Sequence, residues 1–240
     1  MTVKAYAASY QQFSTDLLHR TACSLEPDNG GGCFLLLTDG AFAQEALVAM
    51  LRACRYVPAG DMAVALHAAF AAGADAAASA ETSERADRKP DDFLEGWWNP
   101  LAAVGAYLGG SSIMTASLGD GRVVVVRRGG IAHSTHPHTV ADENPELAPE
   151  SAAAFSNVST VRLEPKCLAN LRSEEWRVES EDTIILMPGR LSGCLSNEDI
   201  ASLVAESRFE EVATSLFRKA FGQALPQPDT SVVVAKVSFP

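Results

Sequence analysis

Three closely spaced histidines are the first residues whose types suggest chemistry. His133, His136 and His138 have an H-x-x-H-x-H spacing, which is compatible with a transition-metal site. Pro137 lies inside the motif and no cysteine is nearby, so we favour a polar loop after a strand. The metal site is the alternative.

The sequence gives only weak support for a catalytic nucleophile or a phosphate-binding loop. Ser111, Ser112 and Ser192 lack a G-x-S-x-G elbow and would need an oriented base to attack a substrate. The glycines at 109–110 and 30–32 are more typical of hairpin turns than of phosphate-binding loops. The five cysteines form no C-x-x-C pair, which favours free thiols in a reducing compartment.

Composition narrows the classes of function. The 240 residues are 47% hydrophobic and 20% charged, which predicts one globular domain over 1–240. The net charge is -11 and the basic clusters are short, such as Arg127-Arg128, so we expect no nucleic-acid partner. No apolar run approaches the roughly 18 residues of a membrane span. We expect a cytoplasmic protein without membrane insertion, although an acid-free stretch at 1–15 leaves organellar import open.

Hydrophobic periodicity predicts the elements that must position any site. Short apolar, β-branched runs predict strands at 33–37, 101–108, 111–118, 122–128, 183–187 and 231–237. Helical spacing predicts helices at 43–56, 61–80, 196–205 and 209–221, with Ser196 and Asp199 as a capping box. Loop insertions are expected near 79–95 and 142–157. Because residues 123–126 are apolar on both faces, their strand should be covered on both sides, and the element order predicts two antiparallel sheets flanked by helices.

Five segments together resemble the metal-dependent type 2C protein phosphatases. Residues 113–129 (IMTASLGDGRVVVVRRG) resemble the family's "LYVANVGDSRAVLCRDG", and residues 35–40 (LLLTDG) resemble its strand ending in Asp-Gly. Residues 134–138 (STHPH) resemble "LTxDH", residues 181–196 (EDTIILMPGRLSGCLS) resemble "DxFLILASDGLWDVLS", and residues 228–234 (PDTSVVV) resemble "DNxTVVVV". The segments come in the family's order and cover most of the chain.

The resemblance implies both a fold and a kind of site. The fold is an α+β, four-layer α-β-β-α sandwich of two antiparallel sheets. The family holds two divalent ions, Mg or Mn, through converging aspartates and activates a water for attack on a phosphomonoester. By resemblance, Asp39 is the bridging ligand and Gly40 offers its carbonyl. Asp16 matches the acidic residue of an N-terminal motif, and Asp120 matches an aspartate near an accessory ion.

Several ligand positions depart from the family. Gly189 stands where a metal-binding aspartate is expected, and Arg190 brings a positive charge next to it. Pro228 occupies the C-terminal ligand position, and Asp229 would replace it only after a one-residue slip that turns a strand side chain to the other face. Residues 41–43 are Ala-Phe-Ala where the family has a Gly-rich turn. The remaining carboxylates are too few to hold a pair of ions.

Three hypotheses follow. The first is a pseudophosphatase without a metal cofactor, a scaffold that binds other proteins within a larger assembly. The second is an active metal-dependent serine/threonine phosphatase with rearranged ligands. The third is a phosphopeptide-binding module that uses Arg190. Trp97 and Trp98 are the partner-binding candidates: exposed, they would anchor an interface, and buried, they would be core.

Overall fold

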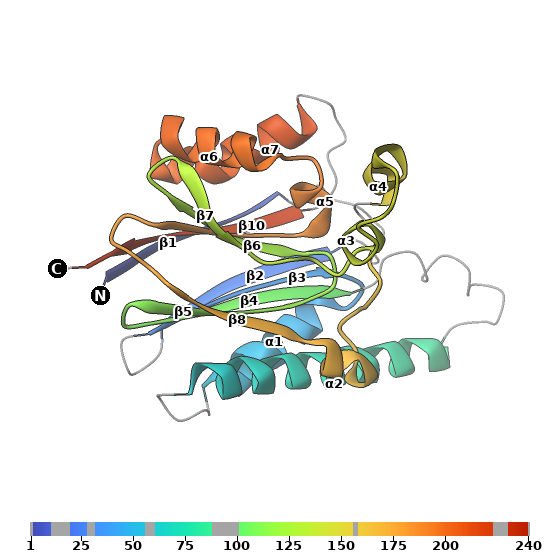
Figure 1. Cartoon of the computed structure of the whole chain (residues 1–240). Coiled ribbons are helices and arrows are strands. Elements are labelled where there is room, and N and C mark those ends of the chain that lie inside the picture. The colour runs from blue at the N-terminus through green and yellow to red at the C-terminus, as the bar shows by residue number, and fades with distance from the viewer. Residues whose placement is uncertain are drawn as a thin grey trace.

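The strands and helices stack in four layers (Figure 1). The computed structural model describes residues 2–10, 20–27, 32–55, 61–87, 101–155, 158–222 and 230–239. Helices α1 and α2 cover one face of the stack, two sheets form its middle, and helices α6 and α7 cover the other face. This is the α-β-β-α sandwich that the sequence predicts.

Each sheet contains five strands, and every pair is antiparallel. Sheet A has the order β1-β10-β9-β6-β7, and its strands are Thr2–Tyr10, Thr230–Ser238, Thr183–Met187, Arg122–Arg127 and Gly130–Ser134. Sheet B has the order β2-β3-β4-β5-β8, and its strands are Arg20–Pro27, Cys33–Gly40, Ala102–Gly109, Ser112–Leu118 and Arg172–Arg177.

Helices occupy both outer layers and the connections between strands. They are α1 (Ala43–Cys54), α2 (Met62–Asp87), α3 (Val140–Glu143), α4 (Pro149–Phe155), α5 (Gly189–Ser192), α6 (Asn197–Glu206) and α7 (Val212–Phe221). Two 3-10 helices, η3 (Pro165–Asn170) and η4 (Phe209–Glu211), complete the set. The capping box predicted for α6 is present: the Ser196 side chain accepts from the Asp199 N–H, and the Asp199 side chain accepts from the Ser196 N–H.

Apolar side chains fill all three spaces between the layers. One cluster packs α1 and α2 on sheet B, one lies between the sheets, and one packs α6 and α7 on sheet A. On β6, Val123 and Val125 face the space between the sheets, whereas Val124 and Val126 face the helices. All four are buried, which confirms the prediction that this strand is covered on both sides.

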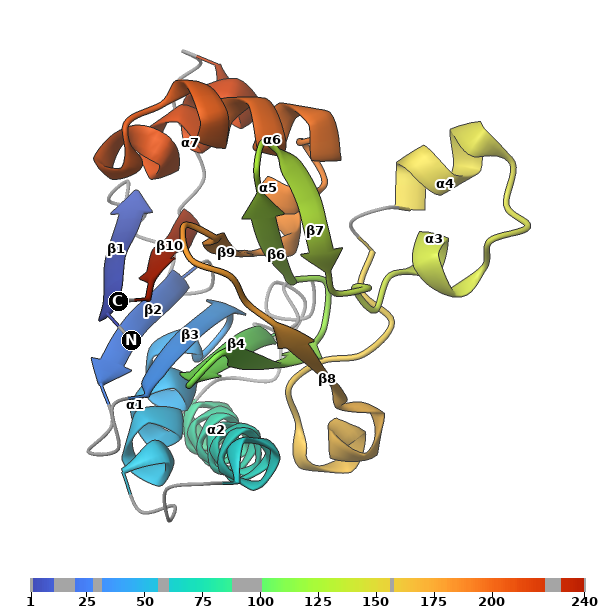
Figure 2. The ribbon, with the colours of Figure 1, turned by 60° about the vertical axis from the view of Figure 1, so that its left-hand side comes forward.

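Two segments predicted as loops contain helix. The stretch 79–87 is the last part of α2, and its alanines, glutamates and arginine favour helix. Within the helix, the hydroxyl groups of Ser79, Thr82 and Ser83 donate to carbonyls four residues earlier. The stretch 142–157 overlaps α3 and α4, which project beyond the edges of the sheets (Figure 2). The amino-acid composition of these two segments did not reveal their helices.

Helix α2 has one further property. By length and composition, its segment 62–83 would be able to cross a membrane, which the absence of long apolar runs had not suggested. Leu66 and Phe70 of this helix are buried in the cluster against sheet B, so its apolar stripe also serves as core.

Candidate functional site

Asp39 lies at the end of β3. Leu35 and Leu37 belong to the cluster between the sheets, and residues two apart share a face of a strand, so Asp39 is on the inter-sheet face. It is paired with Ala102 of β4, and part of its side chain is accessible. Gly40 follows with a φ of 124°, which glycine adopts without strain. The strand therefore brings a carboxyl group to the edge of the inter-sheet space.

The turn between β5 and β6 carries Asp120 to the same edge. Gly119 opens this turn with a φ of 104°, and a Cβ on it would lie 2.6 Å from the Cβ of Ala102. Only glycine permits so close an approach. Because Ala102 is also the strand partner of Asp39, the turn that bears Asp120 lies next to Asp39.

Gly189 completes this edge. It follows β9 and begins α5, and its ideal Cβ position is 2.1 Å from both Cγ and Oδ2 of Asp120. The Asp120 carboxyl group therefore occupies the volume that any side chain at position 189 would need. The absence of a side chain at position 189 therefore makes room for the Asp120 carboxyl group.

Hydrogen bonds hold the strand that follows Asp120. A terminal nitrogen of Arg122 donates to Ser134 Oγ of β7 at 2.7 Å and to Asn197 Oδ1 of α6 at 3.0 Å. Burial lowers the pKa of Arg122, and the charge of Asp142 opposes this effect. The start of β6 is thus tied to a neighbouring strand and to a helix of the outer layer.

The electrostatics of this edge disfavour ionised carboxylates. Burial first, and then the charge of Asp120, raise the pKa of Asp39 from 3.8 to about 7, while the charge of Arg190 lowers it. Burial also raises the pKa of Asp120, against its own backbone N–H and Arg190. The surroundings therefore favour the protonated form of both carboxyl groups more than water does.

The described part of the chain contains no group of three or more His, Cys, Asp or Glu residues that could hold a metal ion. Asp39 and Asp120 contribute two carboxyl groups, and Gly189 contributes none. The two other candidate ligands, Asp16 and the replacement candidate Asp229, lie outside the described residues. The same holds for Pro228 and for the partner-binding candidates at 97–98.

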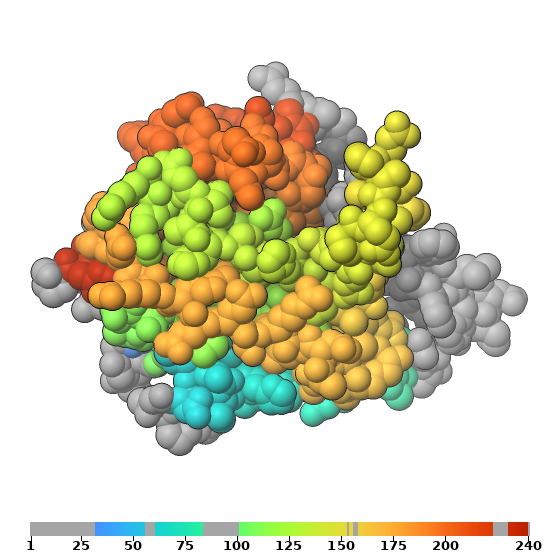
Figure 3. Space-filling model, in the orientation of Figure 1, coloured from blue at the N-terminus to red at the C-terminus, as the bar shows by residue number. Residues whose placement is uncertain are grey.

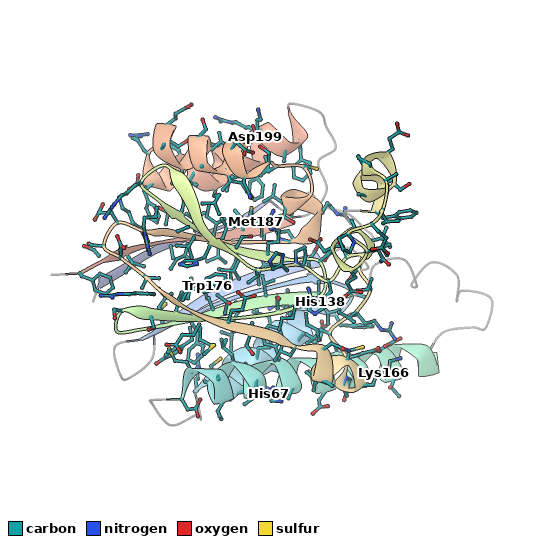
Figure 4. All side chains as sticks on the ribbon, viewed as in Figure 1. His67, His138, Lys166, Trp176, Met187 and Asp199 are labelled. Carbon is teal, nitrogen blue, oxygen red and sulfur yellow. The ribbon has the colours of Figure 1, made fainter. Side chains whose placement is uncertain are left out.

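The three histidines do not form one group. His133 of β7 stacks on Trp176 of β8, with ring centroids 5.1 Å apart and planes at 10°, so it joins the edge strands of the two sheets. His138 is buried, and its Nε2 lies 2.9 Å from the carbonyl oxygen of Asn170 (Figure 4). His136 is exposed. These residues belong to a strand and the connection after it, and they take structural roles.

Sequence reasoning identified Asp39, Asp120 and Gly189 as members of one site, and the structure brings these three together. It did not foresee that the carboxyl group of Asp120 fills the place of the absent side chain at 189. The sequence contains two features that point to this arrangement. An aspartate lies between two glycines at 119–121, and a glycine stands at 189, where the resemblance predicts an aspartate.

Comparison with known proteins identifies the fold. The sequence matches no protein-family profile and no curated protein. The structure is similar to the serine/threonine phosphatase PstP/Ppp of Mycobacterium tuberculosis, with a TM-score of 0.80 at 20% identity over 100% of both chains. It is also similar to the phosphatase Stp1 of Staphylococcus aureus, with a TM-score of 0.78 at 15% identity over 100% of this chain and 96% of that one. The catalytic domain of PstP in complex with two manganese ions gives 0.74 at 19% identity over 99% of each chain.

Proposed function

The chain has the fold of the metal-dependent type 2C serine/threonine phosphatases, and from this premise we propose that it is a catalytically impaired member of that group, a pseudophosphatase that acts by binding other proteins. The observation that carries the proposal is the meeting of Asp120 with Gly189. A centre for two divalent ions needs several carboxylates around the ions. Here one carboxyl group takes the space in which another would project.

The donor set therefore does not fit a pair of ions in the described part of the chain. The Asp120 carboxyl group fills the space of a side chain at position 189, so the two described carboxyl groups, Asp39 and Asp120, have no third beside them from this segment. Arg190 adds a positive charge at the position after Gly189. We derive no hydrolytic step from this arrangement.

One observation favours a second candidate, an active phosphatase with rearranged ligands that uses Mg or Mn. Asp120 delivers a carboxyl group to the place of the missing residue, so it is a candidate replacement ligand beside Asp39. Asp16 and Asp229 would have to complete the set. The catalytic domain of PstP, which was solved in complex with two manganese ions, supports manganese as the cofactor of such an enzyme.

A protrusion supports the protein-binding part of the proposal. The arm formed by helices α3 and α4, with residues 140–155 and 158, stands out from the body of the protein in the space-filling view (Figure 3). Phe155 and Val158 of this arm are 42% and 45% exposed. Its acidic side chains are also exposed: Asp142, Glu143, Glu146 and Glu150. An apolar surface flanked by acids fits a partner with an apolar pocket in a basic surround.

Two further parts of the proposal concern Trp97-Trp98 and the compartment. The two tryptophans stay partner-binding candidates, because large aromatic residues dominate interface energies. We propose a reducing, intracellular location, which the free thiols of Cys167 and Cys194 support.

Metal titration beside a phosphatase assay tests the catalytic part. We expect calorimetry with MnCl2 to give no signal for two bound ions and expect no metal-dependent hydrolysis of a phosphoserine peptide. Asp39→Asn is the control. Metal-dependent turnover that disappears in this variant would reject the pseudophosphatase and establish the second candidate.

The partner-binding part is tested with the double variant Phe155→Ala/Val158→Ala, with Trp97→Ala/Trp98→Ala alongside. If the arm is the interface, the first variant should lose the partners captured by the wild type and keep its melting temperature, because its side chains are exposed. Val64→Ala is the matched control, since Val64 is 54% exposed on α2. Retention of every partner by a stable arm variant would place the interface elsewhere.

A further inference from the structure

The strand β8 is an outermost strand of sheet B, because it pairs with β5 on one side only. Its register with β5 runs without a bulge over all six residues. The neighbouring edge strand of sheet A, β7, differs: a register shift interrupts its pairing with β6, and helix α6 packs against it. Bulges and covering helices close a sheet edge to other chains. The edge of β8 has no bulge, and the strand belongs to the orange band on the front face of the molecule (Figure 3).

The outer edge of β8 presents backbone groups of Ser173 and Glu175. The N–H of Val178, directly after the strand, donates to the carbonyl of Ser111 at 2.9 Å. In an antiparallel pair, every second residue counted back from Val178 therefore directs its N–H and C=O to β5. The residues between them, which include Ser173 and Glu175, direct theirs outward. Among the described residues, none bonds to these outward groups of Ser173 and Glu175.

Arginine side chains delimit this open stretch at both ends. A terminal nitrogen of Arg127 donates to the outward carbonyl of Arg177 at 3.0 Å. At the start of the strand, Arg172 donates to the carbonyls of His136 and Pro137 at 3.1 and 2.9 Å, which holds that connection against the strand. The edge therefore offers a short row of donors and acceptors with defined ends.

The middle of this row is acidic. Glu175 is exposed, and Glu174 accepts a hydrogen bond from Nε1 of Trp176 at 3.0 Å (Figure 4). Neither glutamate forms an ion pair with another residue that the structure describes. The whole chain has a net charge of -11. The β8 strand of a second copy would bring two more glutamates to the same edge, whereas a basic strand would pair with those already there.

We propose that the edge of β8 binds an extended segment of a partner protein in which lysine or arginine alternates with β-branched residues, and that this segment adds a strand to sheet B. Main-chain hydrogen bonds to Ser173 and Glu175 supply affinity, and a cation beside Glu175 supplies specificity. The inference deepens the proposed function and rests on its protein-binding part, because it names a surface and the chemistry of the partner.

Amide hydrogen exchange of the full chain, followed by NMR, tests the added strand directly. The probe is a peptide of alternating lysine and threonine, and a peptide of alternating glutamate and threonine is the matched control. At saturation, the lysine peptide should slow the exchange of the Ser173 and Glu175 amides at least about tenfold, and the glutamate peptide should not. Unchanged exchange with the lysine peptide would overturn the inference. Slow exchange of these amides in the concentrated chain alone would also overturn it, in favour of a second copy.

Variants separate strand addition from attraction between opposite charges. Ser173→Pro removes one outward N–H and keeps the pairing with β5, since an edge strand accepts proline where the N–H faces solvent. We expect it to bind the fluorescein-labelled lysine peptide at least about fivefold more weakly in fluorescence anisotropy. Ser173→Ala keeps the N–H and should bind as the wild type does. Glu175→Lys should weaken the lysine peptide and strengthen the glutamate peptide.

Equal affinity of the wild type and a folded Ser173→Pro for the lysine peptide would reject strand addition, because charge alone would then explain binding. If the melting curve shows that Ser173→Pro does not fold, the amide exchange of the wild type decides. If the wild type hydrolyses a phosphoserine peptide with Mn²⁺ and still shows slowed exchange at β8, the pseudophosphatase fails and the binding edge stands. If exchange at β8 is unchanged while Phe155→Ala/Val158→Ala loses its partners, the inference fails and protein binding through the arm survives.

Discussion

The paired strands β6 and β9 carry charged clusters at both ends, and the two clusters differ in how their charges are satisfied. At one end, Arg127 donates from Nε to Asp182 Oδ1 at 2.9 Å and from a terminal nitrogen to Oδ2 at 2.8 Å. The N–H of Glu179 also donates to Asp182, at 2.8 Å. At the other end, Asp39 and Asp120 crowd each other beside Arg190 without an ion pair among the described residues.

The contrast distinguishes a cluster whose charges the fold stabilises from one whose charges it destabilises. Hydrogen bonding to Asp182 raises the pKa of Arg127, so the fold stabilises that charge. Burial and Asp120 raise the pKa of Asp39, so the fold destabilises this one. Charges that a fold destabilises gather at present or former sites of chemistry, because packing alone gives no reason to keep them.

The largest expected effect comes from breaking the satisfied cluster. Asp182 has 1% of its side chain exposed, so Asp182→Ala would leave Nε of Arg127 and the backbone N–H of Glu179 without the acceptor that they share, although Arg127 keeps its contacts with the Arg177 carbonyl and Glu179. We expect a loss of about 3 kcal/mol in the free energy of unfolding, measured by urea denaturation. Arg128→Gln, which removes an 85% exposed partner of Glu179, is the control and should change little. A loss below about 1 kcal/mol in Asp182→Ala would contradict the assignment.

The next effect comes from relieving the destabilised cluster. The folded pKa of Asp39 is about 7 and its ordinary value is 3.8, so its contribution to stability is present below pH 3.8 and lost as the pH rises through 7. Asp39→Asn removes that loss. Because the side chain is partly accessible, we expect a gain of roughly 1–3 kcal/mol at pH 8 and little change at pH 4. Denaturation at the two pH values tests this, and a variant less stable at pH 8 would refute it.

A smaller effect tests the contact between Gly189 and Asp120. In Gly189→Ala, the new Cβ must displace the Asp120 carboxyl group, and the backbone must also shift because the Cβ of Asp120 would lie only 2.7 Å away. We expect a cost of at least about 1 kcal/mol in chemical denaturation. Gly189→Ala in an Asp120→Gly background should cost less, because that background has no side-chain atoms at position 120. The control is Gly130→Ala, where the nearest atom is 3.8 Å away. Equal costs in both backgrounds would mean that the two residues do not interact.

The smallest effect belongs to the exposed pair Lys236–Glu181, whose atoms are 2.8 Å apart. Lys236→Gln should change the free energy of unfolding by less than about 0.5 kcal/mol, because solvent screens a pair with 36% and 67% of its side chains exposed. A loss in the free energy of unfolding as large as that of Asp182→Ala would mean that burial does not set the strength of these ion pairs.

Much of the fold was predictable because its signals are local. The hairpin of β4 and β5 follows from two apolar runs joined at Gly109-Gly110, and the capping box fixes the start of α6. The end of α2 was not predicted, because its polar composition suits both a loop and the solvated end of a helix. Its hydroxyl groups bind its own carbonyls, and composition does not reveal that.

The sequence by itself determined which residues end the strands, and so which carboxyl groups reach the edge of the sandwich. Asp39 comes at the end of a strand that is buried on both faces, and Asp120 sits between two turn glycines, so both placements are set by neighbours in the chain. Only the tertiary structure decided that Asp120 fills the space at Gly189. These two residues lie on segments far apart in sequence, and the distance between them depends on how two sheets pack, which no local pattern encodes.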